Sequence, residues 1–198
     1  MRRRAFVVAL ACAVALADAA AQTAASPPLA GDALVARLRA GGVTLYFRHV
    51  ATDFSQNDSR YVHGDCTTQR NLTDAGRADA RAIGAEIRRL RIPVGDVLAS
   101  PFCRTMETAT LTVGRATESP EARGGPAEAD RYGDLRRMLA TPPAARTVRV
   151  VSSHGNPFRA LTGTQLAEGE AAVVAPGPGD AFTVLARIPK DGWRSIGR

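Results

Sequence analysis

Short apolar segments alternate with amphipathic segments along most of this chain. The β-branched and aromatic segment 43–47 predicts a first strand, and 94–99 and 147–152 have the same character. Segments 171–175 and 181–188 are predicted as the last strands and are candidates for antiparallel edge positions. Because strands alternate with helices, we expect a three-layer α/β/α sandwich built on a mainly parallel sheet.

The predicted helices are recognised by apolar stripes and by residues typical of helix ends. Ile83, Ile87 and Leu90 recur at helical spacing, Thr73 is a candidate N-cap, and Pro93 ends this helix. The other predicted helices cover 32–40, 102–113, 130–139 and 157–161, and the predicted surface loops cover 50–71 and 117–128.

Residues 1–21 are predicted to be a secretory signal peptide. Three arginines at positions 2–4 precede an apolar stretch that is too short to span a bilayer, and 19–21 form a small-residue cleavage site. The alternative is a short buried N-terminal helix. A cleaved signal implies a periplasmic or secreted protein without stable membrane insertion, with 22–31 as a disordered lead-in and 32–198 as one domain.

The charge balance favours anionic ligands. The chain has 26 Lys and Arg residues against 19 Asp and Glu residues, and three of these arginines and one aspartate lie in the predicted signal. The remainder is still basic, and it contains no long block of like charges of the kind that binds nucleic acid. A protein with this balance attracts anions, and we expect no nucleic-acid partner.

Cationic side chains follow three of the predicted strands. Arg48 and His49 follow the first strand. Arg104 lies in the first turn after the second strand, and His154 follows the third. Because parallel strands end at the same edge of a sheet, we expect these groups to share one crevice. Such crowding is unfavourable without an anion, and arginine forks and helix N-termini bind phosphate well, so the sequence predicts a phosphoryl site.

Four motifs in this order resemble those of the histidine phosphatase superfamily. They are the Arg-His element in Phe47–Thr52, the helix start Leu72–Ala80, the Ser-Pro-x-x-Arg element in Ser100–Ala109, and His154-Gly155. Together they span most of the chain. The resemblance implies a phosphoglycerate mutase-like fold, with 32–198 as the catalytic domain, in the branch that lacks Asp after the second His.

The resemblance also implies a mechanism, the hydrolysis of a phosphomonoester without a metal or other cofactor. His49 would attack phosphorus and form a phosphohistidine that water later hydrolyses. It must then be neutral, with its second ring nitrogen donating a proton to a carbonyl or similar acceptor. Arg48, Arg104 and His154 would bind the phosphoryl oxygens. The expected partner is a phosphorylated small molecule.

Other interpretations of these residues stay open. The two histidines could be satisfied core residues, or a zinc pair with His63 and Cys66. The enzyme could cleave phosphohistidine or another phosphoramidate, or the chain could be a phosphoryl-binding module without turnover. Cys66 and Cys103 are the cysteines outside the predicted signal; they are a possible disulfide, and the alternative is two separate buried thiols.

The chain departs from the usual family pattern at Val50, which stands where glycine is common, so the backbone there is more restricted. Thr52 and Asn156 are candidate substrate-binding residues; an ordinary loop threonine and a helix N-cap are the alternatives. Gly155 excludes a general acid directly after the second histidine. The candidates for this acid are Asp130, Glu128 and Glu168, with Asp134 and Glu170 as further possibilities.

Overall fold

The computed structural model describes residues 27–125 and 130–198, which contain one six-stranded sheet. The strands lie in the order β3-β2-β4-β1-β5-β6. The predicted signal peptide, residues 1–21, lies outside the described residues. The strands are β1 (Val43–Arg48), β2 (Val94–Ala99), β3 (Thr117–Glu118), β4 (Val148–Ser153), β5 (Ala171–Pro176) and β6 (Phe182–Ile188).

Four neighbouring strands of the sheet are parallel and two are antiparallel. β1 and β2 both pair with β4 in parallel, and β3 pairs with β2 in parallel. β5 runs antiparallel beside β1, and β6 runs antiparallel beside β5. The prediction of a mainly parallel sheet with antiparallel strands at one edge is confirmed.

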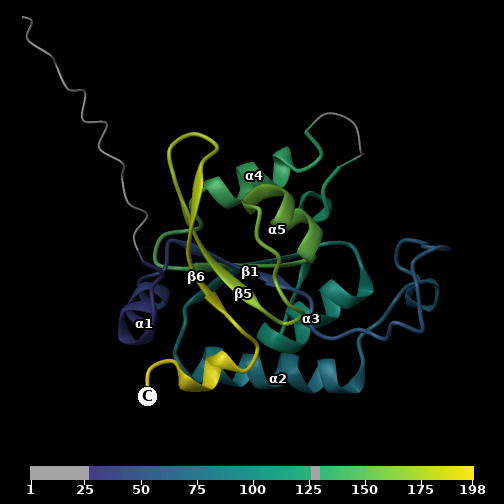
Figure 1. The fold of residues 1–198 in the computed structure, drawn as a ribbon, viewed down its shortest axis with the longest axis horizontal. Helices are drawn as coiled ribbons and strands as arrows, with labels where there is room; N and C mark the ends of the chain where they lie inside the picture. The colour runs from purple at the N-terminus through teal and green to yellow at the C-terminus, as the bar shows by residue number, and fades with distance from the viewer. Residues whose placement is uncertain (1–26, 126–129) are drawn as a thin grey trace, which may run out of the picture.

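Helices cover both faces of this sheet (Figure 1). Alternate residues of β1 face opposite sides, as strand geometry requires. Leu45 and Phe47 belong to the larger apolar core, whereas Tyr46 belongs to a second core with Leu135 and Phe158. The predicted α/β/α sandwich is therefore confirmed. The helices on the larger core are α1 (Gly31–Ala40), α2 (Asp74–Arg89) and α3 (Cys103–Val113), and those on the second are α4 (Gly133–Ala140) and α5 (Gly155–Thr162).

Two predicted irregular segments have more order than expected. Residues 117–118 form β3, and Ser119 donates its N–H to the Ala99 carbonyl at 2.7 Å, so the backbone pairs despite a composition rich in Pro and Gly. In the lead-in, Leu29 donates its N–H to the Leu185 carbonyl at 2.8 Å, and Gly31 begins α1. The expectation of a loop at 117–118 was wrong because composition does not reveal pairing with a distant strand. Residues 22–26 of the lead-in lie outside the described residues.

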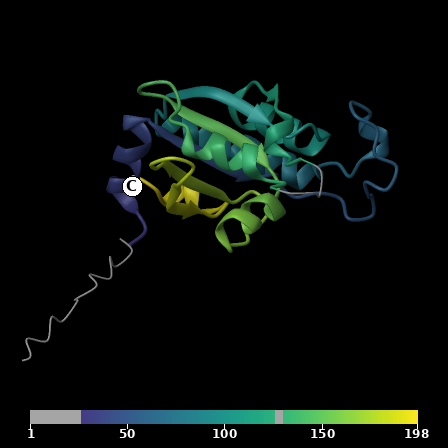
Figure 2. The same ribbon diagram turned by 90° about the horizontal axis from the view of Figure 1, so that it is seen from above.

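The segment 50–71 is the long loop that the sequence predicts. It leaves the carboxyl end of β1 and extends beyond the sheet, at the end of the molecule away from α1 (Figures 1 and 2). It returns to α2, whose N-cap Thr73 accepts a hydrogen bond from the Gly76 N–H at 3.0 Å. Gly76 is needed for close packing here, because a Cβ at this position would lie 2.3 Å from the Ala51 carbonyl oxygen.

Within the described ranges, no helix combines the length and the apolar character needed to cross a bilayer.

Candidate active site

The four predicted catalytic side chains meet at the carboxyl edge of the parallel strands. A cavity of about 410 Å³ lies there, and its lining includes Arg48, His49, Arg104 and His154. β1 delivers the first two, the start of α3 after β2 delivers Arg104, and the end of β4 delivers His154. The crevice expected from the parallel topology is therefore present.

His49 is held as a buried, oriented imidazole. It is 2% exposed, and its backbone N–H donates to the Ser153 carbonyl of β4 at 3.0 Å. Its Nδ1 lies 2.9 Å from the Val50 carbonyl oxygen. Because a carbonyl can only accept, this contact assigns the proton to Nδ1 and leaves Nε2 with a free lone pair. This is the tautomer that a nucleophilic imidazole needs.

The structure accommodates a β-branched residue, Val50, at the position where glycine is common in the family pattern. Its side chain is fully buried in the larger apolar core, and its N–H donates to the Thr108 hydroxyl at 3.3 Å. The Val50 side chain therefore packs inward, while its carbonyl orients the His49 ring.

Both histidines of the cavity are kept neutral. Burial lowers the pKa of His49 to about 3; the Val50 carbonyl opposes this, and the positive charges of Arg104 and Arg48 add to it. Burial is also the main reason why the pKa of His154 lies well below its usual value, and Arg104 lowers it further. A neutral His49 has its lone pair available across the physiological pH range.

This neutrality predicts a loss of stability in mild acid. The unfolded chain protonates a histidine near pH 6.5, whereas folded His49 stays neutral down to about pH 3. Its contribution is therefore complete above pH 6.5 and declines as the pH falls towards 3. We expect the free energy of unfolding to be lower at pH 5 than at pH 7, with about 2 kcal/mol of the difference due to His49. Urea titrations at both pH values measure this. His49→Asn should reduce the difference, and an unchanged difference would contradict the assignment.

The two arginines are fixed by contacts at different sides of the cavity. Arg48 donates from Nη1 to the Leu166 carbonyl at 2.9 Å, and its Nη2 lies 3.6 Å from a Glu168 oxygen. Arg104 is 5% exposed and donates from Nη1 to Asp58 at 3.0 Å. Two guanidinium groups held in this way are suited to bind a tetrahedral anion between them.

His154 completes the group beside His49. The two ring centroids are 5.6 Å apart in an edge-on arrangement. The His154 Nε2 lies 2.9 Å from the Ser100 hydroxyl oxygen, and its carbonyl accepts from the Tyr46 hydroxyl at 2.8 Å. A Ser100 hydroxyl that donates to Nε2 leaves the His154 Nδ1–H free to donate elsewhere.

Comparison with known proteins identifies a family whose sequence pattern this chain shares. The model of the histidine phosphatase superfamily (branch 1) matches residues 45–138, which include the Arg48-His49 and Arg104 elements. Over this segment the chain matches the histidine phosphatase superfamily. No curated protein sequence matches it significantly.

Solved structures show the same fold at low sequence identity. The protein histidine phosphatase SixA complexed with tungstate is 18% identical, with a TM-score of 0.52 over 75% of this chain and 97% of that one. A mycobacterial hydrolase is 14% identical, with a TM-score of 0.51 over 73% of this chain and 98% of that one. These likenesses establish the fold of this chain and nothing about its substrate.

A disulfide ties the long loop of this chain to the candidate active site. Cys66 and Cys103 are bonded, with Cα atoms 5.7 Å apart, and Cys103 directly precedes Arg104. The bonded Cys66 sulfur cannot serve as a zinc ligand, so the zinc interpretation was wrong. His63 instead contacts Glu118 at the surface, at 2.9 Å. Over residues 27–125 and 130–198, no group of three potential ligands is placed to hold a metal ion.

None of the described general acid candidates lines the cavity. A Glu168 oxygen lies 3.9 Å from the His49 Nδ1, on the side of the ring opposite the free Nε2. Asp130 is exposed and binds Arg136 at 2.8 Å. Glu128 lies outside the described residues. The further possibilities, Asp134 and Glu170, are paired with Arg137 and Arg187.

The two candidate substrate-binding residues differ in placement. Thr52 is 5% exposed, and its hydroxyl donates to Glu168 at 2.9 Å rather than lining the cavity. Asn156 does line the cavity, from the first turn of α5. The N-cap of α5 is His154, so the alternative of Asn156 as the N-cap was wrong.

Several lining residues carry no sequence signal. Asp58 is the one carboxylate among the described residues of the lining, and it lies in a long polar loop. Other lining residues were not named as site candidates from the sequence; they are Arg70, Phe102, Arg123, Arg131, Tyr132 and Gln165.

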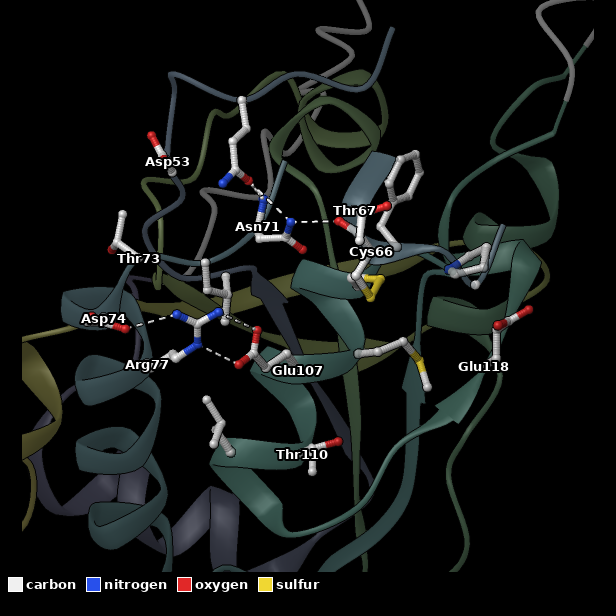
Figure 3. A pocket seen from close by; sticks show the side chains of 18 residues that line it. Asp53, Cys66, Thr67, Asn71, Thr73, Asp74, Arg77, Glu107, Thr110 and Glu118 are labelled. Carbon is white, nitrogen blue, oxygen red and sulfur yellow. Dashed lines mark hydrogen bonds and ion pairs between the residues drawn. A yellow bond between two sulfur atoms is a disulfide. The ribbon is translucent and has the colours of Figure 1, made fainter. Parts of the chain in front are cut away.

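A larger cavity of about 1010 Å³ lies between the long loop, the start of α2 and α3 (Figure 3). Arg77 is the one basic side chain of its described lining. Figure 3 shows this guanidinium between two carboxylates, Glu107 at 2.6 Å and Asp74 at 3.0 Å. Because this charge is already neutralised, the larger cavity is unsuited to a phosphoryl group, and the smaller one is the candidate active site.

Proposed function

We propose that this chain is a phosphatase that hydrolyses phosphomonoesters through a phosphohistidine on His49, without a metal ion. One observation carries the proposal. His49 is a buried, neutral imidazole whose Nδ1 is bound to the Val50 carbonyl, and it shares a cavity with Arg48 and Arg104. Phosphoryl transfer to histidine requires a neutral nucleophile and cationic groups that bind the phosphoryl oxygens.

The first step transfers the phosphoryl group to the enzyme. The free Nε2 of His49 bonds to phosphorus while the bond from phosphorus to the ester oxygen breaks. Arg48 and Arg104, with His154, stabilise the negative charge on the phosphoryl oxygens. The ester oxygen leaves with the bonding pair and takes up a proton. In the second step, the oxygen of a water molecule bonds to phosphorus while the bond from phosphorus to Nε2 breaks and the water gives up a proton to solvent. Inorganic phosphate is released, and neutral His49 is restored.

Protonation of the leaving group is the step for which the described cavity lining is least suited. Partial burial raises the pKa of Asp58, but the Arg70 N–H and the Arg104 charge outweigh this and hold the pKa below its usual value. Asp58 is therefore a carboxylate that orients Arg104 in the free enzyme. A site with this composition favours leaving groups that need little protonation. This favours a second candidate activity, the cleavage of phosphohistidine or another phosphoramidate. The leaving nitrogen of such a substrate is more basic than an ester oxygen, so it is protonated without a dedicated acid.

We also propose that the protein acts outside the cytoplasm, in the periplasm or beyond. The basic and apolar start of the chain supports this, as does the disulfide between Cys66 and Cys103, since disulfides persist in oxidising compartments.

Wild-type protein provides the direct test. With p-nitrophenyl phosphate we expect hydrolysis that is unchanged by EDTA, and with a ³²P-labelled ester we expect acid-labile, base-stable phosphate on the protein after acid quench. Loss of activity in EDTA would reject the metal-independent mechanism. Label that forms but never turns over would identify a phosphoryl-binding module, and hydrolysis without any label would reject the covalent intermediate.

A further inference from the structure

The candidate active site has more positive charge than one phosphoryl group needs. The described lining contains five arginines and one carboxylate, Asp58. A phosphomonoester carries about two negative charges near neutral pH. Arg48 and Arg104 account for these, so a substrate with a single phosphate leaves most of the remaining charge unmatched. The arginines are Arg48, Arg70, Arg104, Arg123 and Arg131.

Arg123 is fixed beside the catalytic groups by two aromatic rings. Its guanidinium carbon lies 4.9 Å from the centroid of Phe102 and 5.0 Å from that of Tyr61. The Tyr61 hydroxyl donates to the Pro101 carbonyl at 3.1 Å, and the two rings lie 4.6 Å apart. Cation–π contacts of this kind position a guanidinium and leave its N–H donors unused.

Phe102 also places Arg123 relative to the phosphoryl site. The same ring lies 4.3 Å from the Arg104 guanidinium carbon and 5.0 Å from the His154 ring centroid. Arg123 is thus next to the groups that bind the phosphoryl oxygens, and its charge contributes to the lowered pKa values of His154 and Arg104. The leaving part of a substrate must occupy the rest of this cavity.

Arg131 extends the positive wall. It lines the cavity, and its guanidinium carbon lies 5.5 Å from the Tyr132 ring centroid. Within the described part of the chain, neither Arg123 nor Arg131 forms an ion pair, whereas Arg48 and Arg104 each contact a carboxylate. Among the described residues, both guanidinium groups are therefore without a carboxylate partner.

We propose that Arg123 and Arg131 form a second anion subsite, and that the substrate is a phosphomonoester whose leaving group carries a further carboxylate or phosphate. This inference rests on the proposed function, because it assigns the substrate class of the same site. Arg123 recognises the second anion in the ground state, so it contributes to specificity, whereas bond breaking occurs at His49.

Matched substrates test the subsite. We would compare 3- and 4-carboxyphenyl phosphate with their carbamoyl counterparts, which have a similar shape and no charge, and add 4-phosphonophenyl phosphate to separate a phosphate-type anion from a carboxylate. We expect wild-type kcat/KM to be at least about tenfold higher for the best anionic substrate than for its neutral counterpart, which corresponds to about 1.4 kcal/mol. Arg123→Gln should remove this preference, and Arg123→Lys should retain part of it.

A matched control is Arg81→Gln, which removes an exposed arginine of α2 outside the cavity and should keep the preference. Thermal unfolding of each variant checks that it folds. Wild-type enzyme that hydrolyses charged and neutral substrates equally well would overturn the subsite and leave the proposed function intact. An Arg123→Gln variant that loses the same factor on both would place Arg123 on the transferred phosphate, which also overturns it. Absence of hydrolysis and of phosphoenzyme with every substrate would instead reject the proposed function.

Discussion

Replacing His49 with asparagine is expected to reduce kcat by at least about 10³-fold and to eliminate the acid-labile phosphoenzyme. Asparagine keeps a polar side chain in the buried position, and its amide N–H can still donate to the Val50 carbonyl that now orients Nδ1. It has no nitrogen lone pair able to attack phosphorus. The loss should therefore fall on kcat, while inorganic phosphate, bound by the arginines, still inhibits. Steady-state kinetics and acid-quench labelling measure the two effects.

His63→Asn is the control for this experiment. His63 is an exposed residue of the long loop that contacts Glu118 of β3. It lies outside the lining of the smaller cavity. Both kcat and phosphoenzyme should stay at wild-type values in this variant. If His49→Asn retained labelled phosphate, the nucleophile would have to be a different residue.

Removing the disulfide by replacing both Cys66 and Cys103 with serine is expected to cost about 3–4 kcal/mol of unfolding free energy. The bond closes a loop with a sequence separation of 37 residues, and a loop of this length gives the unfolded chain much additional freedom when it is opened. Urea denaturation of the variant and of wild type, with and without a reducing agent, measures the difference. In reductant, the unfolding free energy of wild type should approach that of the variant. The unfolding free energy of the variant should be the same with and without reductant.

The same double substitution should also lower activity. The disulfide holds the loop that carries Asp58 against the helix that carries Arg104, and Gln69 supports this contact by accepting the Cys103 N–H at 3.0 Å. With the loop released, Arg104 loses its fixed partner, and KM for p-nitrophenyl phosphate should rise. Wild-type kinetics that are indifferent to reductant, under conditions where free thiols are detected, would contradict this coupling.

The sheet and the catalytic cluster were predictable because each depends on local, strongly patterned sequence. The segment 43–47 is short and rich in β-branched and aromatic residues, which favours a buried strand, and parallel strands must end at a common edge. That rule brings Arg48, His49, Arg104 and His154 together, as the structure shows. The motif glycine Gly76 also has a clear physical role, since it lets α2 approach the backbone at Ala51, just after His49.

The rest of the site depends on contacts between segments with no pattern of their own. Asp58 and Arg123 come from polar loops, and their positions follow from the disulfide and from the Tyr61 and Phe102 rings. β3 was missed because two residues suffice to pair with β2. Glu168 follows His154 in the chain and was a candidate for the general acid, but it lies on the Nδ1 side of His49, where the chain turns into β5.

The antiparallel strand β5 makes the proposed site depend on the C-terminal part of the chain. It covers the edge of β1, and just before it Gly169 donates its N–H to the His49 carbonyl at 3.0 Å. All four proposed catalytic side chains precede it in the chain. A polypeptide that stops before Ala171 therefore holds the complete proposed set but leaves β1, the strand before His49, with an open edge. A nascent or prematurely terminated chain should be inactive, and its unpaired β1 would expose it to aggregation or proteolysis.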